Sequence, residues 1–117
     1  SSMNTNILGQ EMAYHATQVP KSYIEGQVKI WKERRDLIYA GMQDMGLDVA
    51  QPEGAFYIFP KIKDSLQFSW ELFQKHKVIT YPGEWFGAPG YVRFSYALDV
   101  DKISEGLKRV KEFIDSR

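Results

Sequence analysis

The stretch YVRFSYA, residues 91–97, shows the clearest strand pattern in the sequence. Successive side chains of a strand point to opposite faces of a sheet, so Val92, Phe94 and Tyr96 share one face. That apolar face predicts a strand packed against a core. Arg93 then lies on the other face in mid-strand, where a charge without a partner is costly.

Three shorter runs of apolar and aromatic residues precede this strand. They lie at 47–50, 55–59 and 78–81 and are bounded by Gly, Pro and polar residues, a pattern typical of strands. The residues Gln-Pro-Glu-Gly at 51–54 have turn chemistry and join the first two runs. We therefore expect 47–50 and 55–59 to form a hairpin-like unit.

Helical patterns account for most of the remaining chain. Apolar side chains recur every three or four residues from Pro20 to Met45, which predicts one long helix. We expect Ser22 to cap its start, with Glu25 as capping-box partner, and Gly46 to close its end in the left-handed conformation. Shorter helices are predicted at 7–17, at 65–75, and after a cap at Asp99 or Asp101, with an apolar face of Ile103, Leu107, Val110 and Ile114.

The predicted elements follow the order ααββαββα. This order indicates the α+β class, with a small, mostly antiparallel sheet and helices packed on it. The helix at 20–45 is longer than a domain of 117 residues needs. We interpret it as a long N-terminal helix that bridges to another part of a larger protein.

Composition excludes several classes of protein. The chain has 15 basic and 15 acidic side chains and no cysteine. Zero net charge argues against nucleic acid and anionic membranes as partners. The lack of Cys excludes disulfides, Cys-ligated zinc, iron–sulfur clusters and thiol catalysis. His15 and His76 form no metal-binding motif, so we expect no metal site. Neither a secretory leader nor a transmembrane run is recognisable, and we expect a cytoplasmic protein.

Aromatic residues are abundant for one small domain, with 3 Trp, 7 Tyr and 7 Phe. Most rings belong in a core because each buries a large area. A domain of this size does not readily hide so many, and we expect some of them to form a face that something else covers.

Arg93 is the main candidate for chemistry. Aromatic residues flank it, and a loop with Gly and Pro at 82–90 precedes its strand. Three interpretations remain open from the residues alone: an arginine on an exposed sheet face, a structural ion pair, or a two-pronged clamp for a carboxylate ligand. In the third case the loop glycines would allow the backbone to approach the ligand closely.

Four stretches of the chain resemble the C-terminal portion of the class I and II aminotransferases, which are pyridoxal-phosphate enzymes of the aspartate aminotransferase fold type. The resemblance covers residues 20–117 and rests on the order and spacing of all four, since each is weak alone. They are RRD at 34–36, PEGAFYIFP at 52–60, PGEWFG at 82–87 and VRFSYA at 92–97.

The resemblance implies a role for each candidate residue. In this family the arginine of the R-x-S-x-A strand binds the substrate α-carboxylate, and Arg93 occupies that position. Glu84, Trp85 and Phe86 would lie in the loop that closes over the substrate. The family varies at the position of Trp85, whose role stays open.

The resemblance also implies a domain arrangement and partners. Residues 20–117 would be the small domain, and residues 1–19 would be the tail of the large, cofactor-binding domain, with its last helix and an interface segment. The parent would be a homodimer that uses pyridoxal phosphate, an amino acid and a 2-oxo acid. This chain would dock on its own large domain.

The family's Schiff-base lysine lies in an upstream loop that these residues do not contain, and Lys61 and Lys63 stand at a strand end instead. We therefore expect no catalytic and no cofactor-binding residue in this chain, and we expect it to be inactive alone. Three alternatives to an aminotransferase small domain remain: a stand-alone sensor module that binds a small carboxylate, the small domain of a lyase of the same fold type, and a scaffold module with an aromatic face.

Overall fold

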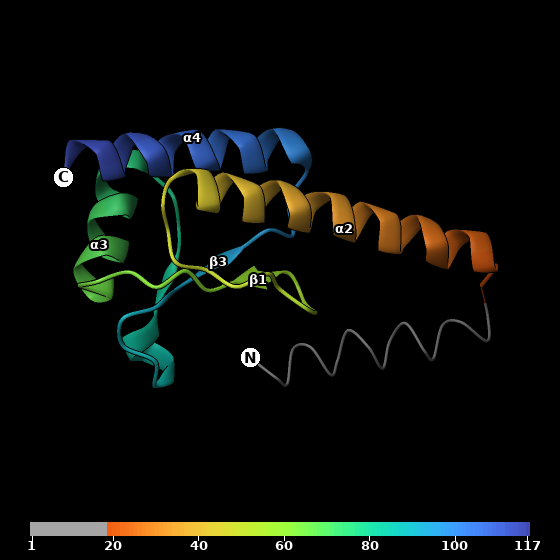
Figure 1. The fold of residues 1–117 in the computed structure, drawn as a ribbon, viewed down its shortest axis with the longest axis horizontal. Helices are drawn as coiled ribbons and strands as arrows, with labels where there is room; N and C mark the ends of the chain where they lie inside the picture. Colours follow the sequence, from red (N-terminus) through yellow and green to blue (C-terminus); the bar gives the residue numbers. More distant parts are fainter. Residues whose placement is uncertain (1–18) are drawn as a thin grey trace.

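The computed structural model describes residues 19–117 (Figure 1). The helix predicted at 7–17, and all of the predicted 1–19 tail except Val19, lie outside the described residues. The described elements are, in chain order, α2 (Lys21–Asp44), β1 (Tyr57–Ile58), α3 (Ser65–His76), β2 (Tyr81–Pro82), the 3-10 helix η1 (Gly83–Phe86), β3 (Val92–Ser95) and α4 (Val100–Ser116).

The three strands form one antiparallel sheet in the order β1-β3-β2. The central strand is β3, which pairs Ser95 with Tyr57 on one side and Arg93 with Tyr81 on the other. Helices α2 and α4 lie side by side above this sheet, and α3 packs against α4 near the C-terminus (Figure 1). The arrangement confirms the predicted α+β class, with a small antiparallel sheet and helices packed on it.

The core lies between β3 and the helices. The predicted apolar face of the central strand is buried, with Val92 and Tyr96 fully inaccessible and Phe94 nearly so. This burial removes large apolar side chains from water, which is the main driving force for the fold. The facing side chains are Ile38 and Met42 of α2 and Ile103, Val110 and Phe113 of α4.

Helices α2 and α4 approach closely at Gly41. A Cβ at this position would lie 2.6 Å from a methyl carbon of Leu107, so glycine permits the close packing of the two helices. The start of α4 agrees with the sequence, because Asp99 Oδ1 accepts the N–H of Lys102 at 2.9 Å and caps the helix.

The long helix α2 ends as predicted but starts differently. Gly46 follows it with φ 81, the left-handed conformation expected there. The predicted Ser22 cap is wrong, since the helix begins at Lys21 without any side-chain cap. Pro20 supplies the extended residue before the helix, which places Ser22 inside the first turn. Glu25, the predicted capping partner, pairs with Lys21 instead, at 3.7 Å.

The part of α2 from Trp31 onward packs against the core. Ile38 and Met42 are its buried residues, and its first turns project beyond the sheet (Figure 1). Tyr23 and Ile30 are exposed on the projecting half. The bridging role expected of this helix stays a prediction.

The predicted hairpin-like unit is wrong. Residues 47–50 form no strand, and only Asp48 makes an isolated bridge, to Lys61. The run at 55–59 contributes only β1, which pairs with β3 rather than with 47–50. Ala55 has φ 59, so the turn extends into the predicted strand and shortens it.

The strands predicted at 78–81 and 91–97 are shifted or shortened. The structure has β2 at Tyr81–Pro82 and β3 at Val92–Ser95. Pro82 has no N–H to donate and is tolerated because β2 is an edge strand. Pairing with β3, rather than the local residue pattern, sets where the outer strands begin and end.

The carbonyl oxygen of Ala55 joins the sheet, helix α2 and the loop between them. It accepts hydrogen bonds from Trp31 Nε1 and from the Tyr96 hydroxyl, both at 2.8 Å. Ala55 is buried at positive φ, a conformation that costs a residue with a side chain about 1–2 kcal/mol. Two donors on one carbonyl hold the residue in that conformation.

Tyr96→Phe tests this anchor. Burial raises the pKa of the Tyr96 hydroxyl to about 12, so the group stays protonated and donates to Ala55 at neutral pH. We expect the substitution to lower the free energy of unfolding at pH 7 by about 1 kcal/mol, the usual size of one hydrogen bond. The loss stays that small because Trp31 still satisfies the carbonyl. Urea denaturation measures it.

The same variant should respond differently to high pH. An exposed tyrosine has a pKa of about 10, so Tyr96 loses its proton in the unfolded chain before it does so in the folded one. Wild-type stability therefore falls as the pH rises from about 10 to about 12. Tyr96→Phe should lose less stability over this range, whereas Tyr23→Phe, at an exposed position, should follow the wild type. Equal losses in Tyr96→Phe and the wild type would contradict the burial of the hydroxyl.

Candidate functional site

Arg93 lies at the centre of the sheet, on the face opposite the core. Alternation along β3 buries its two neighbours and turns Arg93 the other way. Two tyrosines share this face: Tyr81 pairs directly with Arg93, and Tyr57 pairs with Ser95. Because residues paired across strands point to the same side, both rings stand beside the arginine.

The Arg93 guanidinium lies between the two tyrosine rings. Its Cζ is 4.5 Å from the ring centroid of Tyr57 and 4.5 Å from that of Tyr81, and the Phe86 ring is 5.8 Å away. Aromatic faces within about 6 Å attract a cation. Since β1 and β2 flank β3, one tyrosine approaches from each side.

Arg93 carries an unused hydrogen-bond donor. Its Nε is buried and has no acceptor among the described residues. No carboxylate of residues 19–117 lies within ion-pair distance of the guanidinium. A buried polar group left in this way costs about 1–3 kcal/mol. The ion-pair interpretation of Arg93 therefore finds no partner in this part of the chain, and its half-buried side chain is not that of an open sheet face.

This arrangement suits a carboxylate ligand. The guanidinium is always charged and offers parallel N–H donors that match the two oxygens of a carboxylate. The neighbouring rings displace water, and charge attraction is stronger where water is excluded. An anion that reaches the free edge of the guanidinium would satisfy donors that the described chain leaves unpaired.

Glu84 of η1 is held by the start of α3. Its Oε1 accepts the Ser65 hydroxyl at 2.6 Å, and Ser65 Oγ accepts the N–H of Gly90 at 3.0 Å. The hydrogen bond from Ser65, helped by backbone N–H groups that include Leu66, lowers the pKa of Glu84. Glu84 does lie in the loop beside Arg93, but its carboxylate is engaged within the fold, where it fastens η1 to α3.

Gly83, at the start of η1, is required by the loop itself. A Cβ at this position would overlap the carbonyl oxygen of Ala88. The two residues are also linked directly, since the N–H of Ala88 donates to the Gly83 carbonyl at 2.7 Å. At Gly83 the close backbone approach thus occurs between two parts of the loop; the approach to a ligand expected at the loop glycines stays a prediction.

Trp85 and Phe86 extend the aromatic surroundings of Arg93. Phe86 packs edge-on against Phe59, and Trp85 packs edge-on against Tyr81, with centroid separations of 5.9 Å and 6.0 Å. The Trp85 side chain remains 68% exposed. The structure therefore brings Phe86 to Arg93 directly and Trp85 to it through Tyr81.

Sequence reasoning missed Tyr57 and Tyr81 as site residues. Each lies in a predicted strand, but the pairing that places it beside Arg93 joins distant segments. The sequence signal available was alternation along each strand, which turns a tyrosine to the face opposite its neighbour. In the structure those neighbours, Ile58 after Tyr57 and Thr80 before Tyr81, are buried. That signal identifies the face of the sheet without identifying its neighbours.

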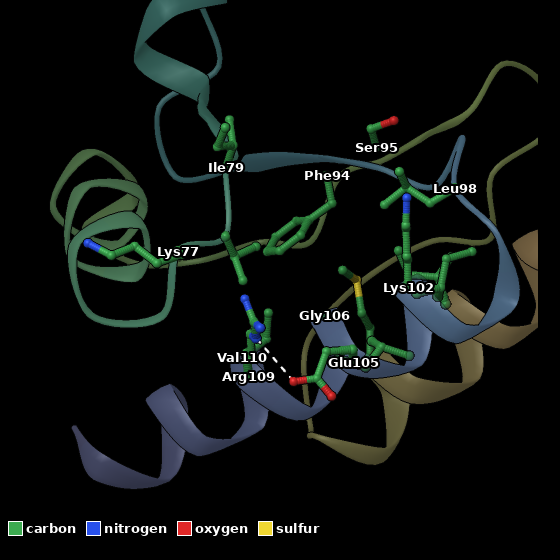
Figure 2. Close-up of a pocket in the computed structure, with 15 residues that line it drawn as sticks. Lys77, Ile79, Phe94, Ser95, Leu98, Lys102, Glu105, Gly106, Arg109 and Val110 are labelled. Carbon is green, nitrogen blue, oxygen red and sulfur yellow. Dashed lines mark hydrogen bonds and ion pairs between the residues drawn. The ribbon is translucent and has the colours of Figure 1, made fainter.

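A second concave region lies away from this site. It is a hollow of about 540 Å³ between α2, α4 and the segment before β2, and Arg93 does not line it (Figure 2). Its lining is mainly apolar. The charged Glu105 and Arg109 pair with each other at 3.1 Å, and Lys77 donates to the Gln74 carbonyl. Since its charged groups are largely satisfied by the chain, we place the candidate site at Arg93.

Residues 19–117 contain no group of three His, Cys, Asp or Glu side chains that could hold a metal ion. Lys61 and Lys63 are exposed. None of the helices in this part of the chain combines the length and apolar character needed to cross a bilayer.

Known proteins are similar in sequence to this chain. The family model for aminotransferase class I and II matches residues 1–110. The aspartate aminotransferase of Thermotoga maritima is 36% identical over 96% of this chain, and aromatic-amino-acid aminotransferase 2 of Thermococcus litoralis is 37% identical over 80% of it. The chain spans only 29% and 26% of the lengths of these two relatives.

Solved structures share the fold. The crystal structure of the T. maritima aspartate aminotransferase matches with a TM-score of 0.78 at 36% identity, over 88% of this chain and 27% of that one. The aromatic aminotransferase from Pyrococcus horikoshii matches with a TM-score of 0.78 at 36% identity, over 82% of this chain and 27% of that one. These likenesses confirm the resemblance drawn from the four sequence stretches.

Glu84→Gln tests whether the carboxylate fastens η1. Because the folded pKa of Glu84 lies below its ordinary value of 4.5, the ionised group stabilises the fold above that pH. The contribution disappears as the pH falls through the folded pKa. We expect Glu84→Gln to have a lower urea midpoint than the wild type at pH 7 and a shallower loss on acidification. Glu33→Gln, at an exposed position of α2, is the control and should behave as wild type. Identical acid profiles for wild type and Glu84→Gln would exclude this role.

Proposed function

The chain belongs to the class I and II aminotransferase family, and we propose that the protein transfers an amino group between an amino acid and a 2-oxo acid. In this proposal Arg93 binds the α-carboxylate that both substrates carry. One observation carries the assignment of Arg93: a half-buried guanidinium between two rings, with a buried N–H that has no acceptor among residues 19–117.

One carboxylate clamp can serve both directions of amino transfer. The amino acid and the 2-oxo acid differ at the carbon that exchanges nitrogen for oxygen, but they share the carboxylate beside it. A guanidinium that contacts only the carboxylate holds either molecule in the same place. Because the carboxylate is bonded to the reacting carbon, binding the carboxylate also fixes the position of that carbon. This supplies the orientation that such reactions need.

Pyridoxal phosphate is the cofactor that the family implies for the whole enzyme. When bound, it supplies the carbonyl group that takes up the nitrogen and returns it. The described residues fit a role toward the substrate. Arg93 is a cation with a buried N–H that has no acceptor among them, whereas Lys61 and Lys63 are exposed. We therefore assign the cofactor and its lysine mainly to residues beyond this sequence.

The domain assignment follows from the same proposal. Residues 20–117 would form the small domain, and residues 1–19 would be the tail of the large domain. The chain spans 29% of the T. maritima relative, and the first turns of α2 project beyond the sheet (Figure 1). The exposed rings of Trp85 and Phe86 would then face the substrate and the large domain. A homodimer and a cytoplasmic location complete the expected enzyme.

A lyase of the same fold type would use Arg93 in the same way, because its amino-acid substrate carries the same carboxylate. The two relatives named above are aminotransferases, which favours amino transfer. The reactions differ in one requirement: amino transfer stops without a 2-oxo acid acceptor, whereas elimination continues. A small-carboxylate sensor would bind the same ligand and release no product.

Arg93→Ala in the full-length enzyme should remove most of the activity. Truncating one partner of a buried charged pair costs about 2–5 kcal/mol, so we expect kcat/KM to fall between about 30-fold and several thousandfold. The loss should be similar for every amino acid tested, since all share the α-carboxylate. Arg93→Lys keeps the charge but not the planar fork and should recover only part of the activity. Steady-state kinetics with a panel of amino acids measures both variants.

Arg109→Ala is the matched control for Arg93→Ala. Arg109 lies on α4, pairs with Glu105, and lines the hollow away from the site. Its removal should leave kcat/KM close to that of the wild type. Unchanged turnover in Arg93→Ala would refute the proposed carboxylate contact.

The 117-residue chain by itself should be inactive. The proposal assigns the lysine and most of the cofactor site to other residues, so this chain lacks the groups that move the nitrogen. We expect no 2-oxo acid from any amino acid when the chain is supplied with pyridoxal phosphate and an acceptor such as 2-oxoglutarate. Measurable amino transfer by the folded chain, verified by circular dichroism, would overturn the domain assignment.

A further inference from the structure

We propose that Tyr57 and Tyr81 are positioning residues that hold Arg93 for its carboxylate ligand. Their rings fix the guanidinium from two sides while leaving its charge available. The inference rests on the proposed function, because it concerns how the same arginine binds the same carboxylate.

The two rings are the closest contacts of a cation with a ring in the described chain. Arg93 lies 4.5 Å from both centroids, whereas the other arginine contacts with rings outside this site are longer. The sheet explains the symmetry: β3 runs between β1 and β2, so each outer strand contributes one tyrosine to the face that holds Arg93. The backbone ladder thus fixes where both rings stand.

Two other arginines of the chain are held differently, whereas Arg117 also lies over two rings, those of Phe68 and Phe113, at the longer distances of 5.3 Å and 5.4 Å. Arg35 lies over the Trp31 ring at 4.9 Å and also pairs with Asp36 at 3.0 Å. Arg109 pairs with Glu105. A carboxylate both orients a guanidinium and neutralises it. Arg93 has two close rings and no ion pair among the described residues, so the rings orient it without neutralising it.

Orientation matters because a free arginine side chain is highly flexible. Fixing its rotatable bonds costs conformational entropy, and a ligand that had to fix them would bind more weakly. No ion pair within residues 19–117 fixes Arg93, and its buried Nε has no acceptor there. The two tyrosine rings, with the Phe86 ring farther away at 5.8 Å, are therefore the aromatic contacts that can limit its motion before the ligand arrives.

Trp85 supports this arrangement from outside. Its ring packs edge-on against Tyr81 at 6.0 Å and remains largely exposed. The 3-10 helix that carries it is fastened to α3 by the bond from Ser65 to Glu84. The position of the Tyr81 ring is thus tied to the loop, which gives a structural role to the residue that sequence reasoning left open.

Tyr57→Leu and Tyr81→Leu in the full-length protein, loaded with pyridoxal phosphate, test the proposal. The probes are 3-phenylpropionate and succinate, which carry a carboxylate but no amino group, and the neutral 3-phenylpropanamide. Titration calorimetry gives their dissociation constants. We expect each Leu variant to bind the carboxylates about 3- to 30-fold more weakly, the range of a cation–ring contact. Binding of the amide should not change, whereas a general loss of structure would weaken all three probes.

Conservative variants separate the ring from the hydroxyl. Tyr57→Phe and Tyr81→Phe keep the aromatic face and should bind the carboxylates within about twofold of the wild type. If a Leu variant fails to fold, pentafluorophenylalanine at position 81 keeps the shape of the ring and weakens its attraction for a cation; it should bind the carboxylates more weakly than Tyr81→Phe does. Tyr91→Leu, at an exposed tyrosine just before β3, is the control and should bind as wild type.

The outcomes distinguish this inference from the function on which it rests. Weaker carboxylate binding in the Leu variants, recovered in the Phe variants, supports the positioning role. Wild-type binding in the Leu variants, together with weak binding in Arg93→Ala, overturns the positioning role and leaves the carboxylate contact standing. Wild-type binding in Arg93→Ala overturns both.

Discussion

The pairing of β3 with a strand on each side is the constraint on which the rest of the structure depends. It buries Val92 and Phe94 against the helices and, by alternation, turns Arg93 to the opposite face. The same pairing brings one tyrosine from each neighbouring strand to that face. Core and candidate site are therefore two faces of one four-residue strand, and a shift of one residue in register would exchange them.

Two sets of side-chain hydrogen bonds hold the segments next to the outer strands in place. Before β1, the Ala55 carbonyl takes hydrogen bonds from Trp31 and Tyr96, which fixes the turn that leads into the strand. After β2, the bond between Ser65 and Glu84 fastens η1 to α3. Strands of two residues make few backbone hydrogen bonds to their neighbours. The side-chain hydrogen bonds therefore supply the attachment that a longer strand would obtain from its backbone. The polar residues nearest the site thus serve mainly to hold backbone in place.

Local pattern was sufficient for the helices among residues 19–117 and for the central strand, and it was insufficient for the pairing around that strand. The spacing of apolar residues predicted α2, α3 and α4, and the alternation in 91–97 predicted which residues of β3 are buried. The run at 47–50 has a strand's alternation but forms only one bridge, because the partner of 55–59 is β3. Arg93 was identifiable from its sequence position, whereas its contacts with Tyr57 and Tyr81 join segments 12 or more residues apart, which no local pattern reports.

The surroundings of Arg93 are better suited to binding than to stability. A buried donor without an acceptor is unfavourable, and a carboxylate from a neighbouring strand would remove that cost, as Asp36 does for Arg35. Such a carboxylate would also compete with any ligand for the same donors. Aromatic neighbours offset part of the cost through the ring faces and leave the donors free. The described chain thus accepts a less stable arrangement at Arg93, and under the proposed function the free energy forgone there becomes available when a carboxylate binds.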